Sequence, residues 1–186
     1  MTPNGLFNRQ RPGRPRAAKR IIKVALMTIV GTFTICGVAG IRINCSPSLP
    51  VGLYLVTAHS DAYLVEFCPV GPFASLGIAR GYRDAGSCSD GGAPLLKPVV
   101  ARPGDIVEVS VAGLAVNGHL VPNTAPMERD TNKRPLTPWP PGRYTVAPDS
   151  IWVASSYNQR SFDSRYFGPV GLGSVRNHVR PWITLP

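Results

Sequence analysis

Acidic residues and cysteines are both scarce in this sequence of 186 residues. Ten acids stand against twenty lysines and arginines, and none of the acids lies among the first 23 residues. The four cysteines form no C-x-x-C or C-x-x-H spacing, so a zinc site has no support, and we expect neither a metal nor another cofactor. Internal repeats are absent as well, and no stretch has the periodicity of a long amphipathic helix.

Proline and glycine, by contrast, are abundant, with twenty and nineteen residues. This composition disfavours a helical bundle and favours short strands joined by turns, in one domain of ordinary size. Asn117 and Gly118 are the residues that a type I′ hairpin turn prefers. We therefore expect a mainly β fold with one short helix around 73–82 and a proline-rich surface loop at 122–143. The predicted strands lie within 52–58, 62–67, 94–105, 105–121 and 150–156.

The positive charge is concentrated at the N-terminus. Seven of the twenty basic residues lie between Met1 and Lys23, whereas the rest of the chain carries thirteen basic and ten acidic residues. A basic arm of this kind can grip nucleic acid. The segment that follows it favours a different partner, and we expect no nucleic acid to bind.

That following segment is apolar, and it carries no charge from residue 24 to residue 41. With the two isoleucines before Lys23 it is long enough, as a helix of about 30 Å, to cross the hydrocarbon core of a bilayer. Because positive residues precede it, the N-terminus should lie in the cytoplasm. We therefore expect a basic cytoplasmic tail at 1–20, a transmembrane anchor at 21–41 that contacts membrane lipid, and a domain at 42–186 beyond the membrane.

Two other interpretations of the apolar segment stay open. The small residues GVAG at 37–40 suit the cleavage site of a secretory signal peptide, although the apolar stretch exceeds the roughly 7 to 15 residues usual there. A buried core helix is the third interpretation, and the basic residues before the segment count against it. The length of the segment favours an uncleaved anchor.

Cysteine usage fits an oxidising compartment beyond the membrane. Cys68 and Cys88 lie in the predicted exported part, and we expect a disulfide between them. Such a bridge would close a loop of about twenty residues and contribute about 3 kcal/mol in the chain-entropy model. Cys36 falls within the apolar segment, where it would pack as a small apolar side chain. Cys45 is then the unpaired thiol.

The stretch 44–54, NCSPSLPVGLY, holds Ser46 and Ser48 among prolines. Either these serines are ordinary residues of a stiff loop, or one of them is presented as a nucleophile. Serine is a weak nucleophile and needs a base to take its proton. No G-x-S-x-G motif accompanies any serine, and the three histidines stand in unremarkable surroundings, so a histidine base has little support. The histidines are His59, His119 and His178.

Lys97 is a stronger candidate for such a base, because apolar residues and a proline flank it in LLKPVV. A lysine amine with its ordinary pKa near 10.4 would stay protonated at neutral pH. Burial disfavours the ammonium form, and lowering the pKa by about three would free the amine at a cost of roughly 4 kcal/mol. The alternative is a strand lysine whose amine reaches the solvent.

A third polar stretch, at 155–170, places Asp163 two residues before Arg165. On a strand the two side chains would share a face, and in a turn they can pair directly. Taken alone, the two residues read as a surface ion pair, which contributes little to stability.

Three motifs, in this order after an N-terminal anchor, resemble the signature boxes of the type I signal peptidases: PSLPVGLY, LLKPVVARPGD and FDSRYFGPV. The nearest likeness is to their conjugative-transfer branch, the TraF-like peptidases that mature pilin precursors, which show the form S-[LI]-P-x-G-L-Y. The last motif lacks the G-D-N-R-D-N lead-in of the general enzymes. Pro98 stands where those enzymes carry an arginine, which would remove a possible partner of Asp163.

The resemblance implies a Ser/Lys dyad on a signal-peptidase-like β domain. Ser48 would be the nucleophile and Lys97 the general base. Ser46 would supply an oxyanion-hole hydroxyl beside the backbone N–H of Ser48. The supporting residues implied are Ser161, which would orient the lysine amine, and Asp163 and Arg165, which would brace the wall around it.

The resemblance also implies a membrane-anchored serine endopeptidase of the bacterial inner membrane, with its catalytic domain in the periplasm, that processes a pilin or similar precursor for conjugative transfer. Water attacking the acyl-enzyme would give hydrolysis, whereas the peptide's own amine would give a circular product, and the residues do not decide between them. A general type I signal peptidase for exported preproteins and a non-catalytic pilus-assembly factor stay open as alternatives. A self-cleaving repressor would need a DNA-reading domain, for which the 23 residues before the anchor are too few.

Overall fold

The computed structural model describes residues 20–25, 27 and 40–185. The chain consists of two compact units, residues 1–40 and residues 41–186. In the first unit, the described residues before Gly40 are helical. Most of the predicted anchor at 21–41 lies outside the described residues, and within them no helix is long and apolar enough to cross a membrane. The second unit, which carries every predicted site residue, is called the β domain below.

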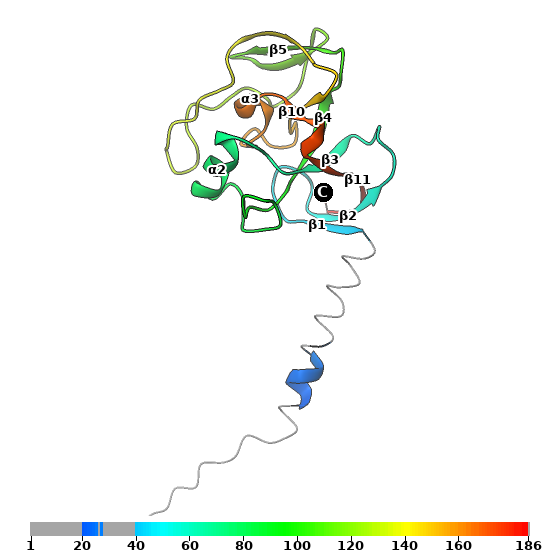
Figure 1. Cartoon of the computed structure of the whole chain (residues 1–186). Coiled ribbons are helices and arrows are strands. Elements are labelled where there is room, and N and C mark those ends of the chain that lie inside the picture. Colours follow the sequence, from blue (N-terminus) through cyan, green and yellow to red (C-terminus); the bar gives the residue numbers. More distant parts are fainter. Residues whose placement is uncertain (1–19, 26, 28–39, 186) are drawn as a thin grey trace, which may run out of the picture. The chain divides into compact units, whose positions relative to one another are not determined.

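Two antiparallel sheets make up the described part of the β domain, so the mainly β fold is confirmed. The larger sheet has the strand order β1-β2-β11-β3-β4-β9-β10, and the smaller has the order β7-β6-β5-β8. Figure 1 shows the smaller sheet at the top of the domain, and β1 and β2 at the bottom. The larger sheet consists of β1 (Ile41–Asn44), β2 (Gly52–Thr57), β3 (Leu64–Phe67), β4 (Leu95–Ala101), β9 (Ser150–Val153), β10 (Val170–Gly171) and β11 (Val175–Thr184). The smaller sheet consists of β5 (Ile106–Ser110), β6 (Gly113–Val116), β7 (His119–Leu120) and β8 (Gly142–Thr145).

The sequence predicted three strands of the smaller sheet, β5, β6 and β7, whereas β8 was not predicted and begins within the loop expected at 122–143. Asn117 and Gly118 join β6 to β7 with the positive φ angles, 50° and 82°, that a type I′ turn requires. The predicted helix is α2 (Pro72–Ala79). The sequence did not predict the four-residue helix α3 (Ser164–Phe167) or the 3₁₀ turn η1 (Leu172–Ser174), because both are too short to show a helical period.

The core is organised by β9, because successive residues of a strand point to opposite faces. Trp152 packs in a cluster with Val107 and Leu114 of the smaller sheet. Its neighbours Ile151 and Val153 pack in a second cluster, which is completed by residues of β3, α3 and β10. One strand thus serves both clusters and joins the smaller sheet to the larger one.

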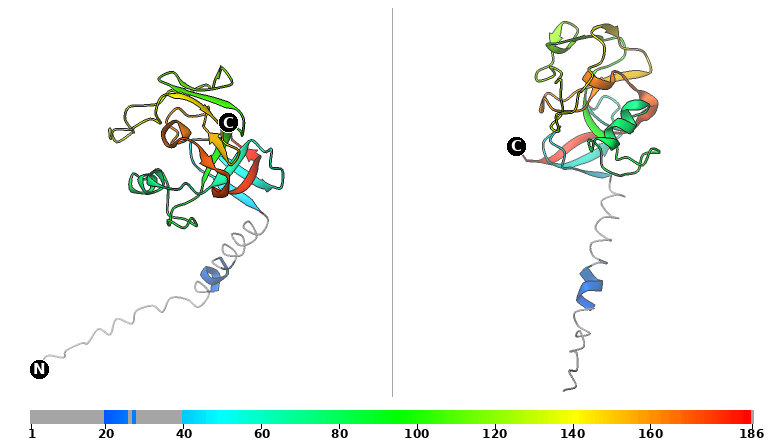
Figure 2. Two further views of the ribbon diagram at one scale, coloured as in Figure 1. Left: turned by 45° about the horizontal axis from the view of Figure 1, so that its top comes forward. Right: turned by 90° about the vertical axis from the view of Figure 1, so that its left-hand side faces the viewer.

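The segment between β3 and β4 carries α2 and the disulfide expected from the sequence, Cys68–Cys88. Arg83 anchors the segment with a buried guanidinium that lies 2.7 Å from a carboxylate oxygen of Asp90. The two short helices α2 and α3 lie near each other in Figures 1 and 2. Phe73 of α2 packs against Phe167 of α3, with ring centroids 6.2 Å apart, so the segment is held against the core.

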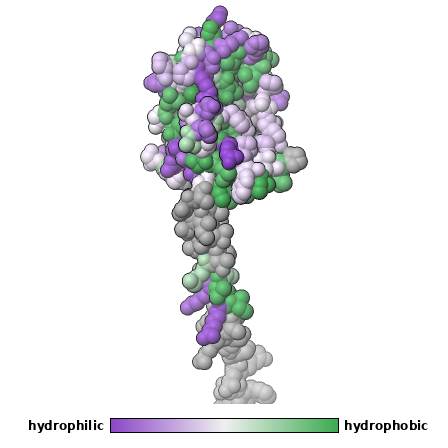
Figure 3. All heavy atoms as spheres, turned by 90° about the vertical axis from the view of Figure 1, so that its right-hand side faces the viewer, coloured by the Kyte–Doolittle hydropathy of each residue, from purple (hydrophilic) through white to green (hydrophobic). Residues whose placement is uncertain are grey.

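Apolar side chains also reach the surface at the end of the larger sheet. On the face shown in Figure 3, apolar residues gather along the lower edge of the β domain, where Figure 1 places β1 and β2. Ile43 of β1 and Trp182 and Ile183 of β11 are each more than half exposed. This edge of the sheet therefore combines a strand without an outer partner in the described residues with exposed apolar side chains.

Gly52 begins β2 directly after residues 45–51, the serine loop, which closes the hairpin between β1 and β2. β11 passes so close that an added Cβ at Gly52 would lie 2.2 Å from the carbonyl oxygen of Ile183. We predict that Gly52→Ala lowers the free energy of unfolding by about 3 kcal/mol in urea denaturation. Gly171→Ala is the matched control, since an added Cβ there meets nothing within 4 Å. Equal losses in the two variants would contradict this packing.

Candidate active site

Ser48 and Lys97, 49 residues apart in the sequence, meet in the β domain. Ser48 lies in the serine loop, and Lys97 lies midway along β4. Lys97 Nζ is 2.6 Å from Ser48 Oγ. Both residues are buried, with exposed fractions of 8% for Ser48 and 3% for Lys97. The alternative in which the lysine amine reaches the solvent is therefore wrong.

The serine loop is oriented by the residues that follow Ser48. Leu49 is buried in an apolar cluster with Tyr54, Leu64 and Val179, which fixes the loop to the sheet. The Tyr54 hydroxyl donates a hydrogen bond of 2.6 Å to the carbonyl oxygen of Pro50. With Leu49 directed into the core, the neighbouring Ser48 is left to face β4.

The Lys97 amine has a second partner, because its Nζ also lies 2.8 Å from Ser161 Oγ. Burial lowers the pKa of Lys97 from 10.5 to about 8, with Asp163 opposing the shift and Arg165 adding to it. Lowering the pKa by this amount costs about 3 kcal/mol of folding free energy. Because the folded-state pKa is the lower one, that cost is present in full below pH 8 and vanishes above pH 10.5.

This arrangement can carry out proton transfer. With a pKa of about 8, roughly one molecule in ten holds a neutral amine at pH 7, about 300-fold more than an ordinary lysine provides. A neutral amine can donate a hydrogen bond to Ser161 and at the same time accept one from the Ser48 hydroxyl. The geometry thus allows Lys97 to take the Ser48 proton.

Ser46 lies beside the nucleophile candidate, as the resemblance implied. The backbone N–H of Ser48 donates to Ser46 Oγ at 3.3 Å. In this contact the Ser46 oxygen is an acceptor, so its own O–H is still available as a donor. The two donors are neighbours, and both can bind one oxyanion once the Ser48 N–H exchanges its bond to Ser46 Oγ for a bond to that oxyanion.

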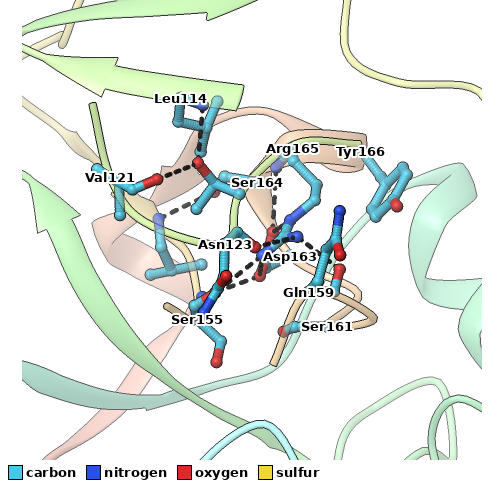
Figure 4. A network of polar contacts seen from close by, with 12 residues as sticks. Leu114, Val121, Asn123, Ser155, Gln159, Ser161, Asp163, Ser164, Arg165 and Tyr166 are labelled. Atoms are coloured by element: carbon cyan, nitrogen blue, oxygen red, sulfur yellow. Dashed lines mark hydrogen bonds and ion pairs between the residues drawn. The ribbon is translucent and has the colours of Figure 1, made fainter. Parts of the chain in front are cut away.

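Asp163 and Arg165 form a buried pair, so the interpretation as a surface ion pair is wrong. Their side chains are 0% and 1% exposed, and Arg165 Nε lies 2.8 Å from Asp163 Oδ1. Figure 4 shows the pair at the centre of a polar network. All five N–H groups of Arg165 are used, because it also donates to the carbonyl oxygens of Asn123, Gln159 and Ser155. These carbonyls come from two segments, Asn123 from the one between β7 and β8 and the other two from the one between β9 and α3. The short spacing of Asp163 and Arg165 in the sequence did not reveal that these segments enclose the pair.

Pro98 does not leave Asp163 without a partner, contrary to the concern raised by its position. Arg165 meets both carboxylate oxygens of Asp163, at 2.8 and 3.0 Å. Asp163 also accepts a hydrogen bond from the backbone N–H of Arg165 and thereby caps the N-terminus of α3. Arg165 of the short helix α3 therefore provides the positive charge that an arginine next to Lys97 would otherwise have provided.

Two contacts to the serine loop come from residues that the sequence interpretation missed. Asn44, the last residue of β1, bonds the main chain of the loop through its side-chain amide. Ser155, which follows β9, donates to the carbonyl oxygen of Ser48 at 2.5 Å. An asparagine just before a turn is a recognised loop-stabilising residue, so Asn44 carried a weak signal. Ser155 carried none.

A cleft of about 700 Å³ opens over Ser48 and Lys97. Its lining includes residues 42–48, 81–84, 127 and 129–131, together with aromatic side chains from the α3 region. The proline-rich loop reaches the cleft because Asp130 accepts hydrogen bonds of 2.6 Å from both Tyr82 and Arg134. Part of the loop predicted at 122–143 therefore lines the cleft, and most of its residues are exposed or half-buried, as expected of a surface loop.

The other candidate residues lie apart from this contact. Within the part of the chain that the structure describes, none of the three histidines is hydrogen-bonded to Ser48 or Lys97, and no group of side chains has the composition of a metal site. Cys45 is a free, exposed thiol that lines the cleft. Cys36 lies outside the described residues.

Sequence comparison assigns the family. The family profile described as "Signal peptidase, peptidase S26" matches residues 15–183, so the chain belongs to the S26 signal peptidase family. The resemblance drawn from the three motifs is thereby confirmed.

Several curated relatives are similar over most of their length. The "Probable conjugal transfer protein TraF" of Sinorhizobium fredii is 39% identical over 188 residues, which cover 96% of this chain and 95% of the relative. The "Plasmid transfer protein TraF" of Escherichia coli is 37% identical over 154 residues, covering 78% and 84%. A crystal structure of a signal peptidase I from Enterococcus faecalis aligns with a TM-score of 0.35 and 19% identity, over 64% of this chain and 96% of that chain, a likeness too weak to support an argument.

Removing one partner of the buried pair leaves an isolated charge in the core. We predict that Arg165→Met lowers the free energy of unfolding by about 3 to 5 kcal/mol, because the Asp163 carboxylate then has no cation. Urea denaturation measures the loss. Arg143→Met is the matched control, since Arg143 lies 3.8 Å from Glu108 with 68% of its side chain exposed. The control should lose less than about 1 kcal/mol; a similarly small loss for Arg165→Met would rule out the buried pair as a structural element.

Proposed function

We propose that the protein is a membrane-anchored serine endopeptidase in which Ser48 is the nucleophile and Lys97 its general base. The observation that carries the proposal is the 2.6 Å contact between the two side chains, with the amine buried and its pKa lowered to about 8. Lys97 takes the hydroxyl proton as Ser48 Oγ attacks the scissile carbonyl carbon. It then gives that proton to the departing amine, which leaves an acyl-enzyme on Ser48.

The oxyanion formed in this attack is stabilised by the Ser46 hydroxyl and the backbone N–H of Ser48. The Ser48 nitrogen lies 3.3 Å from Ser46 Oγ, so the two groups are neighbours, and the N–H exchanges this bond for one to the oxyanion. A donor of this kind typically contributes about 3 kcal/mol to transition-state stabilisation. Ser161 keeps the amine directed at Ser48, as its 2.8 Å contact with Lys97 Nζ suggests. Asp163 and Arg165 act from behind these residues and do not react.

The substrate we propose is a pilin or similar precursor of a conjugation apparatus. Relatives named as conjugal or plasmid transfer proteins, at 37% to 39% identity, support this choice. The proposal includes anchoring in the inner membrane by residues 21–41, with the tail at 1–20 in the cytoplasm and the peptidase domain at 42–186 in the periplasm. The Cys68–Cys88 disulfide supports the periplasmic location, because disulfides persist in that compartment. An anchored enzyme also meets membrane-associated precursors at a raised effective concentration.

Two other functions lead to different outcomes in the same assay. A general signal peptidase would process many exported preproteins, whereas the proposed enzyme acts on the transfer precursor. A non-catalytic assembly factor would need neither the hydroxyl of Ser48 nor the amine of Lys97. The acyl-enzyme accepts either water or the peptide's own amine, so the mass of the mature product separates hydrolysis from cyclisation.

We predict that Ser48→Ala and Lys97→Met each lower precursor processing by at least about 10⁴-fold. The assay co-expresses the full chain with the pilin precursor of its own transfer system and follows the mass of the precursor. Ser89→Ala is the control, because Ser89 is exposed and outside the cleft lining. Processing that persists in Ser48→Ala would point to the assembly-factor function instead.

The pH dependence of the reaction follows from the pKa of Lys97. The neutral amine is the active form, so kcat/KM should rise about tenfold per pH unit below pH 8 and level off above it. The measurement is kcat/KM of the purified full chain in detergent micelles between pH 6 and 10. A rise that continues past pH 10 would mean that the base is an ordinary, solvated lysine.

A further inference from the structure

We propose that Asn44 and Ser155 are positioning residues that clamp the serine loop from two sides and so align Ser48 with Lys97. The inference rests on the proposed function, because the alignment matters only if Ser48 is the nucleophile. Neither residue touches the reacting atoms. Both act on the main chain that carries them.

Asn44 bonds the loop on both sides of Ser48. Its Nδ2 donates to the carbonyl oxygens of Ser46 at 3.0 Å, Leu49 at 3.3 Å and Pro50 at 3.2 Å. Its Oδ1 accepts from the backbone N–H of Ser46 at 3.2 Å. Two N–H hydrogens serve three carbonyls, so one of them is shared. The side chain is buried and therefore has little freedom to leave these partners.

The composition of the loop explains why an external donor is needed. Pro47 and Pro50 have no backbone N–H, so the loop has few donors of its own for its carbonyl groups. The amide of Asn44 donates to three of these carbonyls with one side chain, and the contact with Leu49 is buried, where an unpaired carbonyl is costly. The prolines limit the backbone conformations that the loop can adopt. The hydrogen bonds of Asn44 stabilise one of these conformations.

Ser155 holds the loop from the side of β9. Its hydroxyl donates to the Ser48 carbonyl oxygen at 2.5 Å and accepts from the backbone N–H groups of Tyr157 and Asn158. These two donors occupy the lone pairs of the hydroxyl oxygen, so its hydrogen is directed at Ser48. Ser155 is completely buried.

The buried ion pair fixes Ser155 in turn. The backbone N–H of Ser155 donates to Asp163 Oδ2 at 3.0 Å, and its carbonyl oxygen accepts from Arg165 Nη2 at 2.9 Å. Figure 4 shows Ser155 beside the pair, joined to it by these contacts. A continuous chain of hydrogen bonds therefore leads from Asp163 and Arg165 through Ser155 to the main chain of the nucleophile.

The clamp predicts a particular kinetic effect. Loss of either residue removes no hydrogen bond of Lys97 itself but lets the Ser48 main chain move. A displacement of about 1 Å can reduce a rate roughly 100-fold. Each substitution should therefore lower kcat, whereas KM and the midpoint of the pH–rate profile near pH 8 should stay unchanged. A residue that only stabilises the fold would lower the melting temperature and leave kcat intact below it.

The experiment uses the purified full chain in detergent micelles and p-nitrophenyl acetate as an acylating probe that needs no precursor recognition. We expect Asn44→Ala and Ser155→Ala to lower the acylation rate constant about 100-fold, with KM within about threefold of wild type. Asn44→Asp keeps an acceptor for Ser46 but places an anionic oxygen against three carbonyls, so it should not restore the rate. Thr124→Val is the control, because Thr124 is buried and bonds the main chain only at Leu114 and Val121; it should keep the wild-type rate.

All rates are measured well below the melting temperature of each variant, and Asn44→Asp serves as the test if Asn44→Ala does not fold. Wild-type acylation rates in the folded Asn44 and Ser155 variants, or a full rate in Asn44→Asp, would overturn the clamp. Ser48→Ala runs alongside as the reference. If Ser48→Ala is inert while the clamp variants are unaffected, the clamp alone is wrong; if Ser48→Ala reacts like wild type, the proposed function is wrong as well.

Discussion

Everything in the site depends on keeping one lysine amine away from water. The 2.6 Å contact between Lys97 and Ser48 has chemical value only if the amine is neutral for part of the time at the working pH. Burial achieves this by lowering the pKa of Lys97 to about 8, and it costs the fold about 3 kcal/mol below that pH. Apolar packing around β4 offsets this cost, because Leu95 and Val99 pack against the hydrophobic cluster that contains Val153. The packing that stabilises the sheet therefore also keeps the Lys97 amine buried and lowers its pKa.

The remaining parts of the site are arranged around this amine at increasing distance. Ser48 and Ser161 contact it directly, from a loop before β2 and a loop after β9. Behind them lies the Asp163–Arg165 pair, which is fully buried and fully hydrogen-bonded. The opposing effects of Asp163 and Arg165 on the pKa of Lys97 partly offset each other, so burial decides its direction. An ion pair placed there can thus order the loops while the pKa of Lys97 stays below its ordinary value.

The sequence revealed the site only where the chemistry is local. Apolar neighbours made Lys97 a candidate base, and the surrounding prolines drew attention to Ser46 and Ser48. The resemblance to signal peptidases then assigned the roles of these residues. The hairpin at Asn117 and Gly118 followed from turn propensity alone. The burial of Asp163 and Arg165 could not be deduced, because it depends on a loop that folds over them and on carbonyls from distant residues. Asn44 and Ser155 act on the main chain by contacts across the fold, which leave almost no pattern in the sequence.

The neutral amine of Lys97 is also the claim most open to direct measurement. The full chain, labelled with ¹³C at the lysine ε-carbons and held in detergent micelles, can be titrated by NMR, with Lys97→Met used to assign the Lys97 signal. The account predicts a midpoint near pH 8 for Lys97. A midpoint at the ordinary value of about 10.4 would show that the amine is solvated and would contradict the account.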